Sequence, residues 1–157
     1  MRRTDKEIAD NMEISEIIRK CRVCRLAMSQ DNMPYIVPLS FGYDENTIYF
    51  HSAVTGKKID MLAANNHVCF EFETDVAVKP DEAAPCDWSF RFRSVIGFGD
   101  VEELSRDEDK IIGLKRIMAQ YSDKQWNFET VSLSGLKVFK IAISSMTAKQ
   151  SPSTRPA

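Results

Sequence analysis

The chain has 157 residues, which is the size of one ordinary domain and is long enough to bury a substantial hydrophobic core. Its formal net charge of −2 excludes a general basic field for nucleic acid or membrane lipid, so any functional positive charge must be local. No apolar segment approaches the length of a membrane span, and the N-terminus lacks a signal-peptide apolar core. We therefore expect a cytoplasmic protein.

The first predicted element is a helix that runs from Thr4 to about Lys20. Thr4 and Glu7 have the spacing of a capping box, in which two side chains satisfy backbone N–H groups at a helix start. Apolar residues recur on one face of this helix at helical spacing, namely Ile14, Ile17, Ile18 and Cys21. The pattern predicts an amphipathic helix.

Cys21 and Cys24 form a Cys-x-x-Cys motif at the end of this helix. A zinc site would need two more ligands, and the sequence has neither a second pair nor a His-x-His set. A thioredoxin-like site would need the pair at the start of a helix that follows a strand. We interpret the two residues as small buried side chains where the helix meets the first strand, with zinc or dithiol chemistry as the weaker alternative.

Six segments have the composition and alternation of strands: 22–28, 34–41, 47–52, 67–73, 89–99 and 136–144. In the fourth segment Val68, Phe70 and Phe72 alternate with Glu71 and Glu73, as in a half-buried strand. The segments are joined mostly by hairpin turns, and helices are few.

The remaining segments predict two helices, two loops and a tail. Residues 57–64 have helical spacing before Asn65, and Ser105 with Glu108 forms a second capping box. The helix that this box opens has an apolar face made of Ile111, Leu114, Met118 and Tyr121. Residues 74–88 and 122–135 predict loops, and 150–157 are too polar and proline-rich to be ordered alone.

These elements favour a mainly β fold, a small antiparallel barrel of six strands with flanking helices. Strands and helices do not alternate, and no Gly-x-Gly-x-x-Gly sequence is present. A doubly wound parallel sheet is therefore disfavoured, and we expect no dinucleotide bound in the Rossmann manner. We expect one domain over residues 1–149 and a disordered tail over 150–157.

Lys57 and Lys58 stand at the first turn of the predicted helix, directly after the strand at 47–52 and Gly56. The N-terminal end of a helix favours anions, so acidic side chains are usual there. Two lysines at this place are consistent with a bound external anion such as a phosphate. The alternative is a solvated lysine pair, and spacing alone does not decide between the two.

Four segments occur together in an order that is typical of a known family. They are Pro-Tyr-Ile-Val-Pro-Leu-Ser-Phe-Gly-Tyr at 34–43, Ile-Tyr-Phe-His-Ser-Ala at 48–53, Gly-Lys-Lys at 56–58 and Ser-Val-Ile-Gly-Phe-Gly at 94–99. With them the chain resembles the FMN-binding split-barrel proteins related to pyridoxamine 5'-phosphate oxidase, from about Arg3 to Lys149. Within these proteins it is most similar to the nitroimidazole-resistance, nitroreductase-like flavoproteins.

The resemblance implies a six-stranded antiparallel split β-barrel that forms a homodimer, with FMN bound between the subunits and no metal. It also implies the cofactor-binding residues: Val37, Pro38, Leu39 and Ser40 along the flavin ring; His51, Ser52 and Ala53 at the ribityl chain and phosphate; Lys57 and Lys58 at the phosphate; and Ser94 with Val95 approaching from the longest strand. The agreement with the electrostatic argument favours the anion site over the solvated pair.

His51 is the candidate catalytic residue, because an imidazole titrates near neutrality and could donate a proton beside a flavin. A histidine matches this place in the nitroimidazole-resistance branch. The alternative is a histidine that packs or hydrogen-bonds at the phosphate end, and we favour this cofactor contact over acid–base work. His67 precedes a strand, and we assign it no special task. Trp88 and Trp126 could cover either the flavin or the edge of the core.

The function that the resemblance implies is an FMN-dependent oxidoreductase. It would pass electrons from a reduced donor, such as NADH or NADPH, to a small electron-poor acceptor such as a nitroaromatic or a quinone. The alternatives are a flavin carrier or redox sensor without turnover, and a split barrel that binds haem or a deazaflavin. Oxidation of pyridoxamine phosphate is disfavoured, because the basic and aromatic residues that hold its phosphate ester are not matched.

Overall fold

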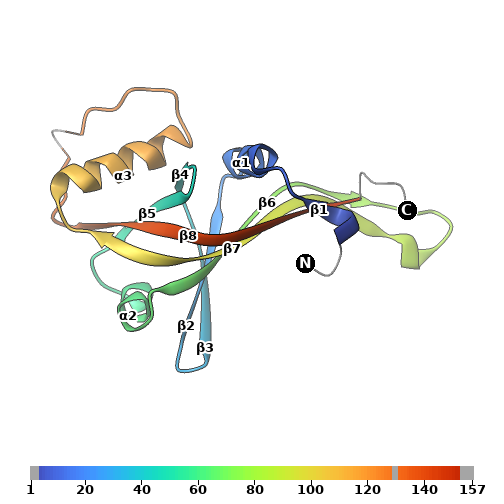
Figure 1. Cartoon of the computed structure of the whole chain (residues 1–157), viewed down its shortest axis with the longest axis horizontal. Helices are drawn as coiled ribbons and strands as arrows, with labels where there is room; N and C mark the ends of the chain where they lie inside the picture. Colours follow the sequence, from blue (N-terminus) through green and yellow to red (C-terminus); the bar gives the residue numbers. More distant parts are fainter. Residues whose placement is uncertain (1–3, 129–130, 153–157) are drawn as a thin grey trace.

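The computed structural model describes residues 4–128 and 131–152. Figure 1 shows the helices and strands of this part of the chain, and alternating apolar and polar side chains define most of the strands. The elements are η1 Thr4–Lys6, β1 Glu7–Ile8, α1 Asn11–Lys20, β2 Cys24–Gln30, β3 Met33–Leu39, β4 Gly42–Asp44, β5 Thr47–Ala53, α2 Lys57–Ala64, β6 His67–Lys79, η2 Pro85–Asp87, β7 Ser89–Leu104, α3 Asp107–Ala119 and β8 Leu136–Ser151.

One antiparallel sheet carries the fold, with strands in the order β3-β2-β6-β7-β8-β5-β4 and with β1 paired to β8. Within the described residues, β3 at one end of this order pairs with neither β4 nor β5 at the other end. The curved sheet is therefore an open, or split, barrel, and the predicted mainly β split-barrel class is confirmed. All six predicted strands are present, and the short strands β1 and β4 raise the number to eight.

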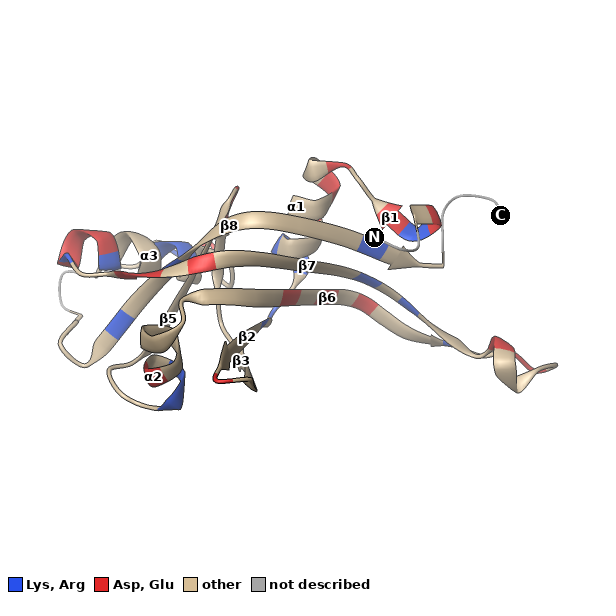
Figure 2. Cartoon of the chain, turned by 60° about the horizontal axis from the view of Figure 1, so that its bottom comes forward, with Lys and Arg blue, Asp and Glu red and all other residues tan. Residues whose placement is uncertain are grey.

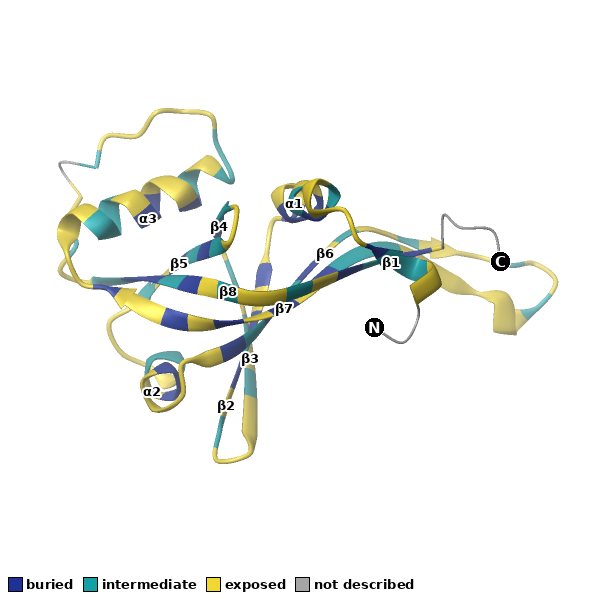
Figure 3. Ribbon diagram, in the orientation of Figure 1, coloured by how far each residue is buried: buried dark blue, intermediate teal, exposed yellow. Residues whose placement is uncertain are grey.

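The inside of the barrel is filled by large buried side chains, and Figure 3 shows buried and exposed positions alternating along the strands. Four phenylalanines there are completely buried, Phe41, Phe50, Phe70 and Phe72. The rings of Phe41 and Phe72 lie with centroids 4.7 Å apart, which is a favourable tilted contact. The apolar faces of α1 and α2 join this core, while α3 packs on Leu104 and Val138 in a second cluster.

The opposite side of the sheet is called here the outer face. On β7 it carries Ser94, Ile96, Phe98 and Asp100, which alternate with the buried positions 95, 97 and 99. α3 covers the outer face over β5 and β8, through its contacts with Tyr49 and Val138. Over β2, β3 and β6 no helix of the described chain covers it, as Figures 1 and 2 both show.

Both predicted capping boxes are wrong. α1 begins at Asn11 rather than near Thr4, and its cap is Asp10, whose carboxylate accepts a hydrogen bond of 2.9 Å from the Met12 amide. The residues before it form η1 and β1 instead, because Glu7 and Ile8 pair with the end of β8. α3 begins at Asp107 and has no side-chain cap, so its acidic first turn alone complements the helix dipole.

Two predicted irregular segments are also more ordered than expected. Of the predicted loop 74–88, the first residues extend β6 to Lys79, and residues 85–87 form η2. β8 continues to Ser151, so the expected tail does not begin at Gln150; Gln150 and Ser151 are buried strand residues. Residues 153–157 of that tail lie outside the described residues. No helix in the described ranges is both long enough and apolar enough to cross a membrane.

Candidate functional site

Two backbone edges without partners lie on either side of the opening in the barrel. β3 pairs only with β2 in the described chain, and its two prolines, Pro34 and Pro38, are typical of an edge strand. Residues 51–53 of β5 pair with β8 on one side, while β4 reaches only residues 47–49 on the other. Free N–H and C=O groups along both edges are available to a ligand.

α2 follows the end of β5 in the chain and contacts β3 and β2 on the other side of this opening. At its start, the Lys57 ammonium sits 4.5 Å from the centre of the Tyr35 ring on β3. At its end, the side-chain amide of Asn65 donates a hydrogen bond of 2.9 Å to the Ser29 carbonyl on β2. We use the name split site for the predicted residues of three elements: residues 37–40 at the end of β3, residues 51–53 at the end of β5, and Lys57 and Lys58 at the start of α2.

The first turn of α2 is built to receive an anion. Gly56 caps it in the left-handed region, with φ of 124° and no side chain to accept a hydrogen bond from the helix. The helical bonds begin at Ile59 and Asp60, whose amides donate to the Gly56 carbonyl. The amides of Lys57 and Lys58 are therefore left without an intrahelical acceptor, and they point out of the helix start.

The two lysine side chains form no ion pair with any residue of the described ranges. Among the described residues no carboxylate lies within ion-pair distance of Lys57 or Lys58, although many other surface cations in the chain are paired. The Lys58 ammonium lies 5.6 Å from the centre of the Phe50 ring, and burial lowers its pKa. A partly desolvated cation without a partner is unfavourable, so this arrangement favours binding of an external anion.

His51 stands at the exposed end of β5, beside this cationic turn. Partial burial lowers its pKa, and the nearby charge of Lys58 lowers it further. The imidazole is therefore neutral near pH 7, with one N–H to donate and one nitrogen to accept. Ser52 is half-buried and Ala53 exposed on the same free edge.

The predicted ring-binding segment alternates between the core and solvent. Val37 and Leu39 are half-buried and pack against the core, while Pro38 and Ser40 are exposed. The segment thus offers a fixed backbone edge rather than a set of mobile side chains. The Lys57–Tyr35 contact places the lysine pair beside β3, and residues 54–56 connect it directly to the end of β5.

Ser94 and Val95 lie on β7, where register aligns Ile96 through β6 and β2 with Pro38, so Ser94 is two residues from the level of Pro38 on β3 but farther along the strand from His51. The Val95 side chain is fully buried in the core, and Ser94 faces outward. Register places Leu104, not Ser94, beside Val138 and hence beside His51. Leu104 is ten residues further along β7, which corresponds to about 33 Å of strand.

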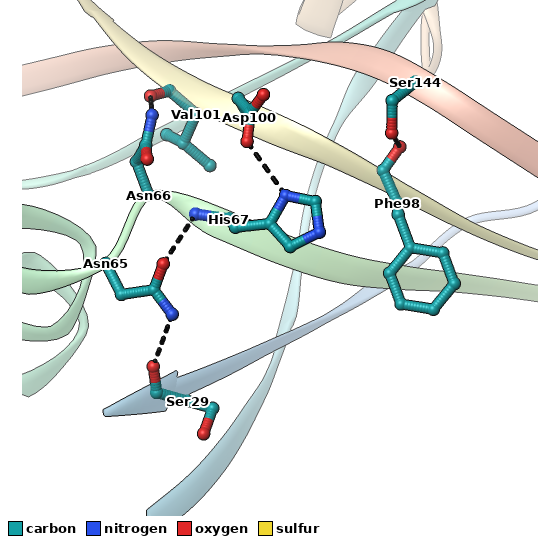
Figure 4. A network of polar contacts seen from close by, with 8 residues as sticks. All are labelled: Ser29, Asn65, Asn66, His67, Phe98, Asp100, Val101 and Ser144. Carbon is teal, nitrogen blue, oxygen red and sulfur yellow. Dashed lines mark hydrogen bonds and ion pairs between the residues drawn. The ribbon is translucent and has the colours of Figure 1, made fainter. Parts of the chain in front are cut away.

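The sequence reasoning missed the polar network at the other end of α2 (Figure 4). The His67 ring lies 2.9 Å from the Asp100 carboxylate and is stacked on Phe98, with ring centroids 6.2 Å apart. The Asn65 side chain accepts a hydrogen bond from the His67 amide while it donates to Ser29. This network fastens the end of α2 to β2 and β7. The sequence feature that indicates this network is the pair of asparagines, Asn65 and Asn66, at the end of the helix.

The remaining candidate residues lie away from the split site. Cys21 and Cys24 are buried in the core, as predicted, and burial raises the pKa of Cys21 to about 11. Trp88 lies between β6 and β7, where its indole donates to the Asp81 carbonyl, and Trp126 lies after α3 beneath Lys124.

Comparison with known proteins gives a family and a fold. Residues 10–150 match the family described as pyridoxamine 5'-phosphate oxidase. A protein from Bacteroides thetaiotaomicron VPI-5482, provisionally named a 5-nitroimidazole antibiotic resistance protein, is 32% identical, and its structure has a TM-score of 0.81 over 92% of this chain and 86% of that one. A comparison with curated proteins gave no match.

Two further solved structures share the fold at lower identity. One is an FAD and heme binding protein from Mycobacterium smegmatis, at 16% identity and a TM-score of 0.81 over 97% of this chain and 76% of that one. The other is an FAD-binding protein from Mesorhizobium loti, at 24% identity and a TM-score of 0.66 over 92% and 96% of the two chains.

Proposed function

Because the chain belongs to the pyridoxamine 5'-phosphate oxidase family, we propose that it is an FMN-dependent oxidoreductase that reduces a small electron-poor acceptor. One observation carries the proposal: two lysines without counter-ions, at a helix start with free amides, lie between two unpaired strand edges. A phosphate satisfies the lysines and amides, while the strand edges suit the polar rim of a flavin ring.

Each part of the split site has one task in this proposal. Lys57, Lys58 and the amides of the first turn hold the phosphate, with Ser52 beside them. The β3 edge over Val37–Ser40 orients the ring. His51, neutral near pH 7, donates a hydrogen bond on the acceptor side. The flavin itself supplies the redox chemistry, accepting electrons from a reduced nicotinamide and passing them on.

A homodimer completes the site, and the outer face supports one. Register aligns Ile36 on β3, Ala27 on β2, Cys69 on β6 and Phe98 on β7 in one row across the sheet. Ile36 is 58% exposed and Phe98 46% exposed, with the equally exposed Ile96 beside them. A contiguous apolar row that nothing covers is typical of a protein interface, and two-fold symmetry is the commonest arrangement.

The proposed dimer would also bring Ser94 close to the split site of the partner. A two-fold axis across the strands at the level of Gly97 would bring Ser94 to the level of the partner's Asp100. Register sets Asp100 beside His67, close to the strand level of Tyr35 and the start of α2. Ser94 would then approach the flavin of the partner.

The experiment is to record the visible spectrum of the purified protein, before and after addition of FMN. We expect an oxidised flavin spectrum that is bleached anaerobically by NADH or NADPH and restored by a nitroaromatic or a quinone. Mass spectrometry of the released ligand distinguishes FMN from FAD, haem or a deazaflavin. A colourless protein that takes up no FMN contradicts the proposal. Bound FMN that no donor reduces would identify a carrier or sensor instead.

A further inference from the structure

The hairpin between β6 and β7 extends beyond the body of the molecule as an arm, defined here as residues 75–91 (Figures 1 and 3). Nearly all of its residues are exposed. Four of these are large apolar side chains that are each more than half exposed: Val76, Val78, Trp88 and Phe90. Such side chains on a projecting element are unfavourable unless another surface covers them.

The arm is held in one shape rather than being a loose loop. Val78 pairs with Phe90 across the two strands. At the tip, the Asp81 carboxylate accepts hydrogen bonds of 2.9 Å from the amides of Ala83 and Ala84. The Trp88 indole donates a hydrogen bond of 2.6 Å to the Asp81 carbonyl, so its ring is fixed on the arm. A preformed aromatic surface costs little entropy on binding.

Along β7 the arm lies far from His51, which belongs to the β5 part of the split site of its own chain. Phe90 lies fourteen residues before Leu104 on β7, and Leu104 is at the strand level of Val138 and His51. Fourteen strand residues span about 46 Å. Figure 2 shows this hairpin at one end of the long strands and β5 and α2 at the other end.

The same spacing brings them together in a two-fold dimer. Gly97 is midway between Phe90 and Leu104, and the exposed Ile96 and Phe98 flank it. An axis across the strands at this level therefore brings Phe90 to the level of the partner's Leu104, in the direction of its split site. α3 bounds the outer face over β5 and β8, so the arm would pass beside it towards α2.

Charge favours the same arrangement. Between Pro80 and Phe90 the arm carries Asp81, Glu82 and Asp87 and no basic residue. The other end of the molecule presents the uncompensated Lys57 and Lys58 (Figure 2). In the two-fold dimer each acidic tip points towards the lysine pair at the start of the partner's α2, while the acidic first turn of α3, residues 107–109, lies on another element of that end.

We propose that the arm of each subunit forms one wall of the acceptor pocket at the split site of the other subunit. Trp88 and Phe90 supply flat apolar surfaces for an aromatic acceptor such as a nitroaromatic or a quinone. The inference rests on the proposed function. It adds the source of the wall, the residues that form it and the class of acceptor that suits them.

Two defective homodimers test the inference. The arm variant W88A/F90A keeps its own split site, while the phosphate variant K57E/K58E keeps its arm. The assay mixes reduced protein anaerobically with nitrofurazone or menadione and follows flavin reoxidation, so no donor has to be known. Trp126→Ala is the matched control, since this tryptophan is similarly exposed but lies after α3.

We expect the arm variant to bind FMN and to dimerise like wild type, but to be reoxidised at least tenfold more slowly. The phosphate variant should bind FMN at least about 100-fold more weakly and so remain unloaded at the FMN concentration used. Refolding the two together, with different tags, should restore about a quarter of the wild-type activity, because half of the dimers are mixed and each has one complete site.

Two results overturn the inference alone: an arm variant as active as wild type, or mixed dimers that form and load flavin but regain no activity. A wild-type protein that takes up no flavin would instead remove the proposed function, and the inference with it.

Discussion

Lys58 shows how a single side chain marks the site. Its stem packs beside Phe50, its ammonium loses hydration, and no carboxylate in the described chain compensates the charge. Native proteins seldom keep such a cation without a purpose, since burial of an unpaired charge is costly. The sequence could place the two lysines at a helix start, but their lack of counter-ions depends on folded contacts and is visible only in the structure.

His51 gives the pH prediction at this scale. Its folded pKa lies below the unfolded value of about 6.5, so the unfolded chain binds the proton first. Stability of the flavin-free protein should therefore fall as pH drops below about 6.5, and H51Q should lessen the fall.

Bound FMN should raise the pKa of His51, because the phosphate favours the imidazolium. Urea unfolding and an NMR titration of the imidazole measure both effects; an unchanged pKa on FMN addition contradicts the phosphate position.

At the scale of elements, alternation of side chains was a reliable guide and helix caps were not. Each predicted strand exists because apolar side chains recur at every second position. The first capping box failed because Glu7 pairs with β8, and Asp10 caps α1 in place of Thr4. Long-range pairing of this kind leaves no local signal. The extension of β6 and β8 past their predicted ends has the same cause.

The packing of α3 on β4 provides an element-scale prediction. A Cβ at Gly42 would lie 2.3 Å from the Arg116 carbonyl carbon and 2.5 Å from the Ile117 nitrogen, both backbone atoms of α3. G42A should therefore destabilise the fold by about 2–3 kcal/mol, through displacement of the helix. G135A is the control, since nothing lies within 4 Å of its Cβ. Thermal unfolding of both variants measures the difference; equal loss in the two would contradict this packing.

At the scale of the whole molecule, the proposed dimer makes the split site of one chain half of a complete site. The resemblance implies a dimer and a flavin, and the register places Ser94 ten residues along β7 from Leu104, which is at the level of His51. Spacing in the sequence could not reveal this, because the strand order of the sheet decides it. The outer face reconciles the two findings.

The dimer prediction concerns that face. I96K/F98K places two charges on the exposed apolar row and should weaken the dimer by about 2–4 kcal/mol, with loss of bound flavin. I112K is the control, since Ile112 is similarly exposed on α3. Sedimentation at several concentrations separates monomer from dimer. Retention of the dimer by I96K/F98K would show that another surface joins the copies.

FMN titration of wild type and K57E/K58E tests the central claim most directly, with quenching of flavin fluorescence as the signal. Two charge-assisted contacts contribute about 1.5–3 kcal/mol each, so we predict at least about a 100-fold weaker Kd for the double variant. K115E, an exposed lysine of α3, should bind FMN like wild type. Equal affinity of wild type and K57E/K58E would contradict the account, because no phosphate would then lie at the start of α2.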